Sequence, residues 1–481
     1  MKSFLRLSAF SLALLAGACS TPTPVGIKDQ DVPKAYTSPI PANAQVWPAE
    51  NWWKTFSSAE LSSLEKTAQE NNLDLAAAEA RVLQAQAQTG ITGSALFPDI
   101  GAVFTAKRSG GPKTPSPPCA ANCSNTGNSF GASLQASYQL DLWGLARSNL
   151  RASEHALRSS QYAQETVALT VASDVANTYL DVLALRERIA ITKANIDAAN
   201  RILTITVAKV TNGVSSNLDL AQQKAQLAGE EARLPALEEQ EREARYALAV
   251  LEGRVPEGFD VAAQELKGVT PPLVAPGLPS ELLARRPDVA TAEANLASAH
   301  ASVDAARAAF FPQIGLTGDA GFASTALSHL FNPSSFLWDI GASVLETIFN
   351  GGLHAAQSDL AKAREKELIA TYRSTVLNAF SDTESALGQV SSLAQQQKLT
   401  EDEVSAAAEA FRISELQYRE GVTDLLSVLQ TQQTLFTAED TLVQIKLARL
   451  QAVVSLYQAL GGGWTVAGTP GLPNANPLRP F

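Results

Sequence analysis

The sequence has little cysteine, methionine or histidine, and it has fewer basic than acidic residues. In 481 residues there are 3 Cys, 1 Met and 4 His, and 48 acidic residues outnumber 37 basic ones, which gives a net charge of −11. This balance argues against nucleic acid as a partner, because phosphate binding needs clustered Lys and Arg. The histidines are scattered, and neither a phosphate-cradling Gly loop nor a nucleophile elbow is present. We therefore expect no enzymatic activity, no metal site and no cofactor.

Long apolar runs are missing apart from one at the N-terminus. The segment "MKSFLRLSAFSLALLAGACS" has basic residues followed by an apolar core from Leu7 to Ala16. This core is too short to span a membrane, which takes about 20 residues, so residues 1–18 are predicted to be a signal peptide. The small residues before Cys19 are typical of a lipoprotein cleavage site, so we expect a lipid on Cys19; plain cleavage is the alternative. Ser20, rather than Asp, favours the outer membrane.

The two remaining cysteines, Cys119 and Cys123, lie in "PSPPCAANCSNTGN". A signal peptide places them in an oxidising compartment, where paired cysteines close loops. Their spacing would also fit two metal ligands, but no His is near. The sequence favours a disulfide at a loop tip.

Two segments alternate between apolar and small polar residues with a period of two. They form hairpins expected over 98–142 and 312–346, with strands of about the 9–11 residues that cross a bilayer. A soluble hairpin with one face on a core would show the same alternation. Together with the signal peptide, the pattern favours strands of a membrane β-barrel.

Very long helical segments follow each hairpin. They are expected over 146–211 and 353–419, and at 1.5 Å per residue each spans roughly 100 Å. Such lengths indicate a coiled coil or a tube of helices. A Gly-containing turn follows each one, at Gly213 and Gly421, and leads into a shorter helix over 217–252 or 423–460.

The chain is an internal duplication. The first repeat covers 58–252, and Ser57 with Glu60 predicts a capping box where it begins. The second repeat covers 281–460. The motifs "ALFPDIG" and "AFFPQIG" mark the same junction between helix and strand in both halves. The rest is assigned to three segments: an N-terminal tether and part of an equatorial region over 19–57, an equatorial linker over 253–280, and a C-terminal tail over 461–481.

Four strands cannot close a barrel, and open sheet edges are not tolerated in lipid. The chain must therefore oligomerise. Two short helices placed end to end nearly match one long helix, so each chain offers four helical staves. We expect a hollow conduit in which a barrel of strands continues into a barrel of helices. A lipid-anchored structural protein that conducts nothing is the main rival.

Several motifs resemble the OprM/NodT-type outer-membrane efflux lipoproteins, which are relatives of TolC. They are "LPSELLARRPDVATAEANL", "AFFPQIGLTGDAGF", "SYQLDLWGLARS", "GVSSNLDL" and "YREGVTDLLSVLQ". The resemblance covers nearly the whole chain from Trp52 to Gly462. It implies a homotrimer with a 12-stranded β-barrel in the outer membrane and a 12-stave periplasmic α-barrel. It also implies a periplasmic adaptor and an inner-membrane transporter of the RND type as partners, and export of drugs or other small toxic compounds. A type I secretion duct is an alternative.

The resemblance also places the pore constriction at the periplasmic tip. The matching positions are Leu426, Ser427 and Gln430. Many relatives have Asp at the second or third of these positions, so we expect weaker block by cations here. In relatives, Tyr, Arg and Asp near the turn hold the channel shut.

The corresponding residues here are Tyr418, Arg419 and Asp424, with Asp219 as a candidate partner of Arg419. Ordinary solvated helix-end charges, which contribute little, are the alternative. The basic pair in Arg285-Arg286-Pro287-Asp288 is compatible with an anion site. A helix start is favoured there, with Pro287 in the first turn and an acid that complements the helix dipole.

Overall fold

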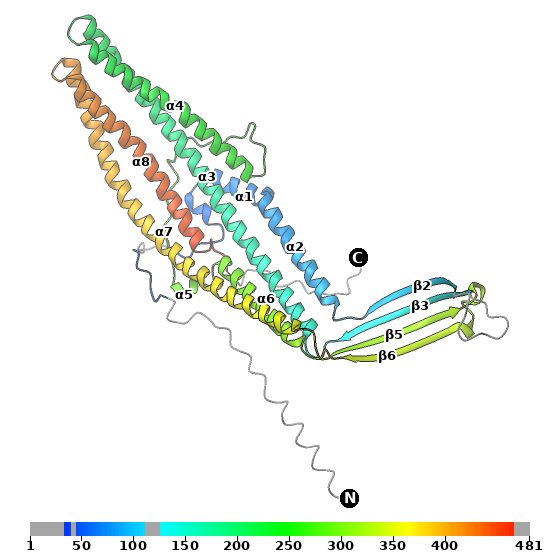
Figure 1. Cartoon of the computed structure of the whole chain (residues 1–481). Helices are drawn as coiled ribbons and strands as arrows, with labels where there is room; N and C mark the ends of the chain where they lie inside the picture. The colour runs from blue at the N-terminus through cyan, green and yellow to red at the C-terminus, as the bar shows by residue number, and fades with distance from the viewer. Residues whose placement is uncertain (1–32, 40–44, 111–125, 466–481) are drawn as a thin grey trace.

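The computed structural model describes residues 33–39, 45–110 and 126–465. Cys19, Cys119 and Cys123 lie outside these residues, as does the expected signal peptide. The described chain has a bundle of long helices at one end and a four-stranded sheet at the other (Figure 1). No helix in the described ranges is both long and apolar enough to cross a membrane.

The sheet joins both expected hairpins. Its strands are β2 (Asp99–Gly110), β3 (Thr126–Leu140), β5 (Gln313–Ser324) and β6 (Phe336–Leu345). They are antiparallel in the order β2-β3-β5-β6, so β3 and β5 connect the two hairpins. Two short 3-10 helices, η3 (Leu327–His329) and η4 (Pro333–Ser335), lie between β5 and β6. Within the described chain β2 and β6 are the sheet edges and have no further strand beside them.

The strand register aligns the apolar positions on one face. Ala320 lies opposite both Leu134 and Trp338. Large apolar side chains on this face are open to the surroundings: Phe104 is 78% exposed and Ile340 is 81% exposed. An apolar face this exposed suits contact with lipid rather than with a core of the same chain.

Each sheet strand that follows a helix begins directly after a proline. Helix α2 (Leu73–Ser94) ends before Pro98, and α6 (Pro287–Ala308) ends before Pro312. Proline disfavours helical backbone in the residue before it, so the same seven-residue motif ends a helix and starts a strand twice.

The two longest helices, α3 (Leu145–Thr211) and α7 (Leu353–Glu420), have 67 and 68 residues. They turn into α4 (Asn217–Leu251) and α8 (Leu425–Ala459). Helices α2 and α4 pack along α3, whereas α6 and α8 pack against both α3 and α7. The four staves therefore follow the same order as the four strands (Figure 1).

An aromatic core lies midway along the helices. Trp52, in the 3-10 helix η2 (Trp52–Phe56), stacks on Tyr457 of α8 with ring centroids 5.0 Å apart. Both rings are almost completely buried, and so is Tyr179 of α3. Helix α1 (Ala59–Asn71) packs on the same part of α3.

The capping box expected at Ser57 and Glu60 is wrong. Ser57 has a φ of 60° and ends η2, and Ser58 caps α1 by accepting the backbone N–H of Leu61 at 3.1 Å. Glu60 instead accepts the hydroxyl of Tyr179 and the backbone N–H of Ala263, both at 3.1 Å. Its carboxylate therefore ties the linker between the repeats to the core.

The linker contains little regular structure. It has strand β4 (Val274–Ala275), which pairs with β1 (Gln45–Val46), and is followed by the one-turn helix α5 (Pro279–Leu282). Arg186 of α3 also contacts the linker, through an ion pair with Asp260. The same guanidinium donates to Glu241 of α4 at 2.8 Å, so it connects the linker with both helices.

Candidate functional site

The two helix turns at the far end of the bundle have the same backbone geometry. Gly213 has a φ of +71° and Gly421 a φ of +80°, in the left-handed region that favours glycine. After each glycine a valine donates its N–H back across the turn, from Val214 to the Lys209 carbonyl and from Val422 to the Gln417 carbonyl, both at 2.8 Å. This is the Schellman motif that ends many helices.

The following helices begin with different caps. Ser216 accepts the N–H of Asp219 at 3.2 Å, and the Asp219 carboxylate accepts the N–H of Ser216 at 2.9 Å, which together form a capping box. In the second turn Asp424 is the cap and accepts the N–H of Ser427 at 2.9 Å. Both carboxylates therefore complete the starts of α4 and α8.

Hydrogen bonds keep the two carboxylates charged. The hydroxyl of Ser215, followed by the backbone of Ser216, holds the pKa of Asp219 below its ordinary value. The hydroxyl and backbone of Ser427 do the same for the pKa of Asp424, and the charge of Asp219 works against them. The two turns of one chain thus place two negative charges close enough to interact.

Tyr418 fixes the second turn to the neighbouring helix. Its side chain is only 3% exposed, and its hydroxyl lies 3.1 Å from that of Thr206 on α3. The Lys209 ammonium sits over the Tyr418 ring, 4.7 Å from its centroid, in a cation–π contact. The sequence does not identify Thr206 and Lys209, because nothing in it shows that the Tyr418 side chain at the end of α7 reaches α3.

Arg419 and Asp219 do not pair within the described chain. Arg419 lies 3.3 Å from Glu415, one turn back on its own helix, and Asp219 is occupied by Ser215 and Ser216. Within one chain, the two candidate partners Arg419 and Asp219 thus make local contacts instead of pairing with each other. The structure brings Tyr418 to α3 but leaves Arg419 on the surface, where its side chain is 55% exposed.

The expected constriction residues lie on the free face of α8. Leu426 is 54% exposed and Gln430, one turn further, is also exposed, whereas Leu425 and Val428 are buried against α3 and α7. Ser427 is half-buried and donates its hydroxyl to Asp424 at 2.7 Å. Because Leu425 and Val428 pack against the neighbouring helices, the opposite side of α8, with Leu426 and Gln430, is left exposed in the single chain.

The Arg285-Arg286-Pro287-Asp288 segment is a helix start, since α6 begins at Pro287. Arg286 is 9% exposed and binds Asp288 at 2.7 Å and Asp382 of α7 at 3.1 Å. The two carboxylates offset the desolvation of Arg286, and the ion pairs fix α6 to α7. In the described chain no group of three or more His, Cys, Asp or Glu side chains is arranged to hold a metal.

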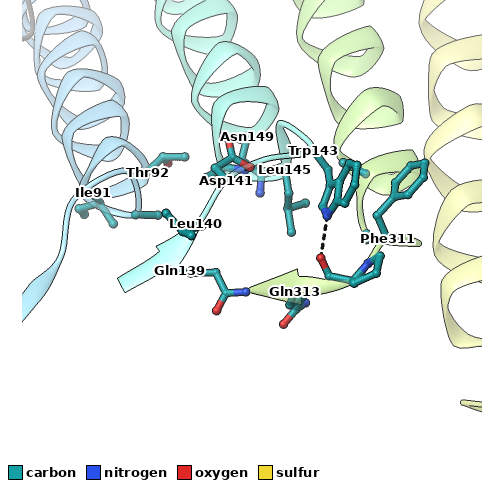
Figure 2. Close-up of a pocket in the computed structure, with 15 residues that line it drawn as sticks. Ile91, Thr92, Gln139, Leu140, Asp141, Trp143, Leu145, Asn149, Phe311 and Gln313 are labelled. Atoms are coloured by element: carbon teal, nitrogen blue, oxygen red, sulfur yellow. Dashed lines mark hydrogen bonds between the residues drawn. The ribbon is translucent and has the colours of Figure 1, made fainter. Parts of the chain in front are cut away.

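The junction between sheet and helices encloses a pocket of about 300 Å³ (Figure 2). Trp143 stacks on Phe311 with centroids 5.0 Å apart and donates its indole N–H to the Pro312 carbonyl at 2.7 Å. Indole rings of this kind concentrate at membrane–water interfaces. The second copy of the junction motif is thus pinned to the residues that follow the first hairpin.

The family profile of outer membrane efflux proteins matches the sequence in two segments, residues 64–254 and 278–462. The chain belongs to this family. Each match covers one repeat of the duplication. A pyoverdine export outer membrane protein of Pseudomonas aeruginosa, OpmQ, is 40% identical over 96% of this chain and 98% of its own length.

Solved structures of efflux channels have the same fold. The outer-membrane channel OprN is 26% identical, with a TM-score of 0.83 over 92% of this chain and 100% of its own. The open state of the Neisseria gonorrhoeae MtrE channel is 27% identical, with a TM-score of 0.82 over 92% of this chain and 98% of its own. The predicted family and fold class are confirmed: a trimeric outer-membrane β-barrel that continues into a periplasmic α-barrel.

The chain is accordingly an outer-membrane exit duct for efflux, and its helices form the periplasmic extension. The family consists of channel proteins rather than enzymes, and its relatives are outer-membrane components of efflux pumps. In such a duct the sheet edges and the order of the helices determine how the chains join, and the two turns lie at the periplasmic tip.

Proposed function

We propose that the duct passively conducts drugs or other small toxic compounds from a periplasmic adaptor and an inner-membrane transporter of the RND type to the outside. The observation that carries this proposal is the shared order of four strands and four helical staves, with β2 and β6 left as open edges. Three chains close twelve strands and twelve staves without an edge in lipid. The duct itself acts without catalysis and without a cofactor other than its lipid.

Conductance of the purified trimer in a planar bilayer tests the conduit. Stepwise currents are expected, with a larger current when the periplasmic tips are opened. A structural spacer of the envelope would insert without current. A type I secretion duct would conduct as well, and is separated by cargo: it would export a protein with its cognate transporter instead of small molecules.

Siderophores are a second candidate cargo. The 40% identical relative is named for pyoverdine export, and it matches almost the full length of this chain. Cargo is selected in the transporter, so the duct should accept any compound that its partners deliver. Export of a siderophore by cells that express this duct with its genomically adjacent transporter would support this cargo, and drug export alone would reject it.

The periplasmic tips are proposed to form the gate. Leu426, Ser427 and Gln430 line the constriction, and Tyr418 with Asp424, Arg419 and Asp219 stabilise its closed state, the last two through contacts between copies. Without an acidic ring at Gln430, divalent cations should block the pore weakly. Gln430→Asp should strengthen that block in single-channel recordings; equal block in both channels would reject the assignment.

Lipidation of Cys19 fits the position of the first described residues. The backbone N–H groups of Thr37 and Ser38 donate to Glu384 of α7, at 2.6 and 3.0 Å. Helix α7 covers about 46 Å between Leu353 near the sheet and Glu384, at 1.5 Å per residue. The 18 residues from Cys19 to Thr37 can reach about 60 Å. Loss of palmitate labelling in Cys19→Ala would support the anchor, and retained labelling would reject it.

Cys119 and Cys123 are proposed to form a disulfide. Their flanking Pro, Asn and Gly residues favour a loop tip, and export places them in an oxidising compartment. Peptide mapping without reductant should recover the two cysteines joined. Two free thiols would contradict the pairing.

A further inference from the structure

The polar face of the four-stranded sheet carries three acidic residues and one basic residue. This lumen face is made of every second residue, in register across the four strands. Most of these residues are small or uncharged. The exceptions are the acidic residues and one lysine: Asp99, Lys107, Asp319 and Asp339.

Two of the acidic residues lie directly opposite each other. Asp319 of β5 is paired with Asp339 of β6, and on its other side it faces Gln135 of β3. Directly opposed residues of antiparallel strands have Cβ atoms about 4.5–5.5 Å apart, and like charges at that distance repel. One carboxylate oxygen of Asp319, Oδ2, is buried and accepts no hydrogen bond from the described residues. The pair is thus not neutralised from within the described chain.

The single basic residue of the lumen face is far from this pair. Lys107 lies opposite Ser129, and Ser129 is six residues from Gln135 along β3, about 20 Å at 3.3 Å per residue. The Debye length is about 10 Å at 0.1 M salt, so the lysine does not compensate the two carboxylates. Asp99 adds a further negative charge on the side of the helices.

We propose that Asp319 and Asp339 make the outer-membrane section of the duct selective for cations and for positively charged cargo. In a threefold trimer the three pairs lie at one height, so two carboxylates per chain become a ring of six. Rings of Asp or Glu side chains are one established basis of cation selectivity in pores.

The three residues proposed to line the tip constriction, Leu426, Ser427 and Gln430, carry no charge. The carboxylates beside them, Asp219 and Asp424, are helix caps that already accept hydrogen bonds. The sheet pair is therefore a separate group of negative charges, at the outer-membrane end of the duct.

The test is the reversal potential of the purified trimer in a planar bilayer with a KCl gradient around 0.1 M. Wild type should prefer K⁺ over Cl⁻. The double variant Asp319→Asn, Asp339→Asn should lower the permeability ratio by about threefold or more, toward unity, as expected when an acidic ring is removed. At 1 M salt, where the Debye length falls to about 3 Å, wild type itself should lose most of its preference.

Two controls separate charge from packing. Asp319→Glu, Asp339→Glu keeps the ring charged and should keep the ratio of wild type. Glu257→Gln removes an exposed carboxylate of the linker and should change nothing. Trimer assembly of each variant is checked by gel filtration.

An unchanged ratio in the double Asn variant at low salt would overturn the proposal, and so would an equal loss in the double Glu variant. If the Asn variant fails to assemble, a wild-type preference that does not weaken between 0.1 M and 1 M salt overturns it instead. Wild-type trimers without any current would overturn the conduit itself, which is a different failure from current without selectivity.

Discussion

The turn between α3 and α4 and the turn between α7 and α8 have one backbone geometry and two kinds of support. Both use a left-handed glycine and a hydrogen-bonded cap. At matching positions, however, the second turn buries Tyr418 and Leu425, whereas the first has half-buried Val210 and exposed Asn217. Left-handed glycines and backbone hydrogen bonds fix the shape of both turns. Buried side chains of the same chain support only the second turn.

The order of the staves does not cause this difference, because each turn joins one inner helix, α3 or α8, to one edge helix, α4 or α7. The difference lies in the side chains: Tyr418 and Leu425 are large enough to reach the core between the helices, whereas Val210 is smaller and Asn217 is polar.

Truncation of Tyr418 should have the largest effect on the difference between the two turns. Tyr418→Ala removes a buried ring and leaves Thr206 without its partner, which should destabilise the second turn by about 3 kcal/mol. Val210→Ala, its counterpart in the first turn, should cost about 1 kcal/mol or less because that side chain is half-buried. Hydrogen exchange of the two turns in the trimer measures both, and equal losses would contradict the contrast.

Replacing Gly213 and Gly421 tests the backbone geometry that the two turns have in common. Gly213→Ala and Gly421→Ala each force a side chain into the left-handed region, at a cost of roughly 1–2 kcal/mol. No atom crowds the first site, and the second has only the Lys209 ammonium at 3.9 Å, so the cost should be the same at both. Faster exchange at one turn alone would show that their backbones differ.

The two caps should contribute similar and smaller amounts. Ser216→Ala and Asp424→Ala each leave N-terminal N–H groups of a helix without an acceptor, which costs about 1 kcal/mol. The loss should appear in the exchange of the first turn of α4 or α8 only. Exchange spreading along the whole helix would mean that the cap supports more than its own end.

Acid should loosen both turns slightly. The folded pKa values of Asp219 and Asp424 lie below their unfolded values, so their contribution is complete above about pH 4. It is lost as the pH falls through the folded pKa. Asp424→Asn keeps an acceptor at the cap and should weaken the pH dependence at the second turn. Proteolytic sensitivity of the tips at pH 6 and pH 3 checks this, and a tip that tightens at low pH would contradict it.

The sequence predicts the elements better than their contacts. Period-two alternation located the strands, and the long uninterrupted helical segments with their two glycines located the helices and turns. The partners of Tyr418 and the pairing of Arg286 with Asp382 could not be predicted, because they depend on which helices lie side by side. Ser57 and Ser58 show the same limit on a short scale: two adjacent serines offer the same chemistry, and the path of the preceding 3-10 helix decides which one caps α1.

The closed-state leak of the trimer in a planar bilayer tests most directly whether the two turns hold the duct shut. Tyr418→Phe removes the hydroxyl that reaches Thr206, and Asp219→Ala removes the capping-box carboxylate of the first turn. We expect the two changes together to raise the leak above that of wild type, and Val210→Ala to leave it unchanged. A leak that stays at the wild-type level in the double variant would contradict the claim that these turns hold the duct shut.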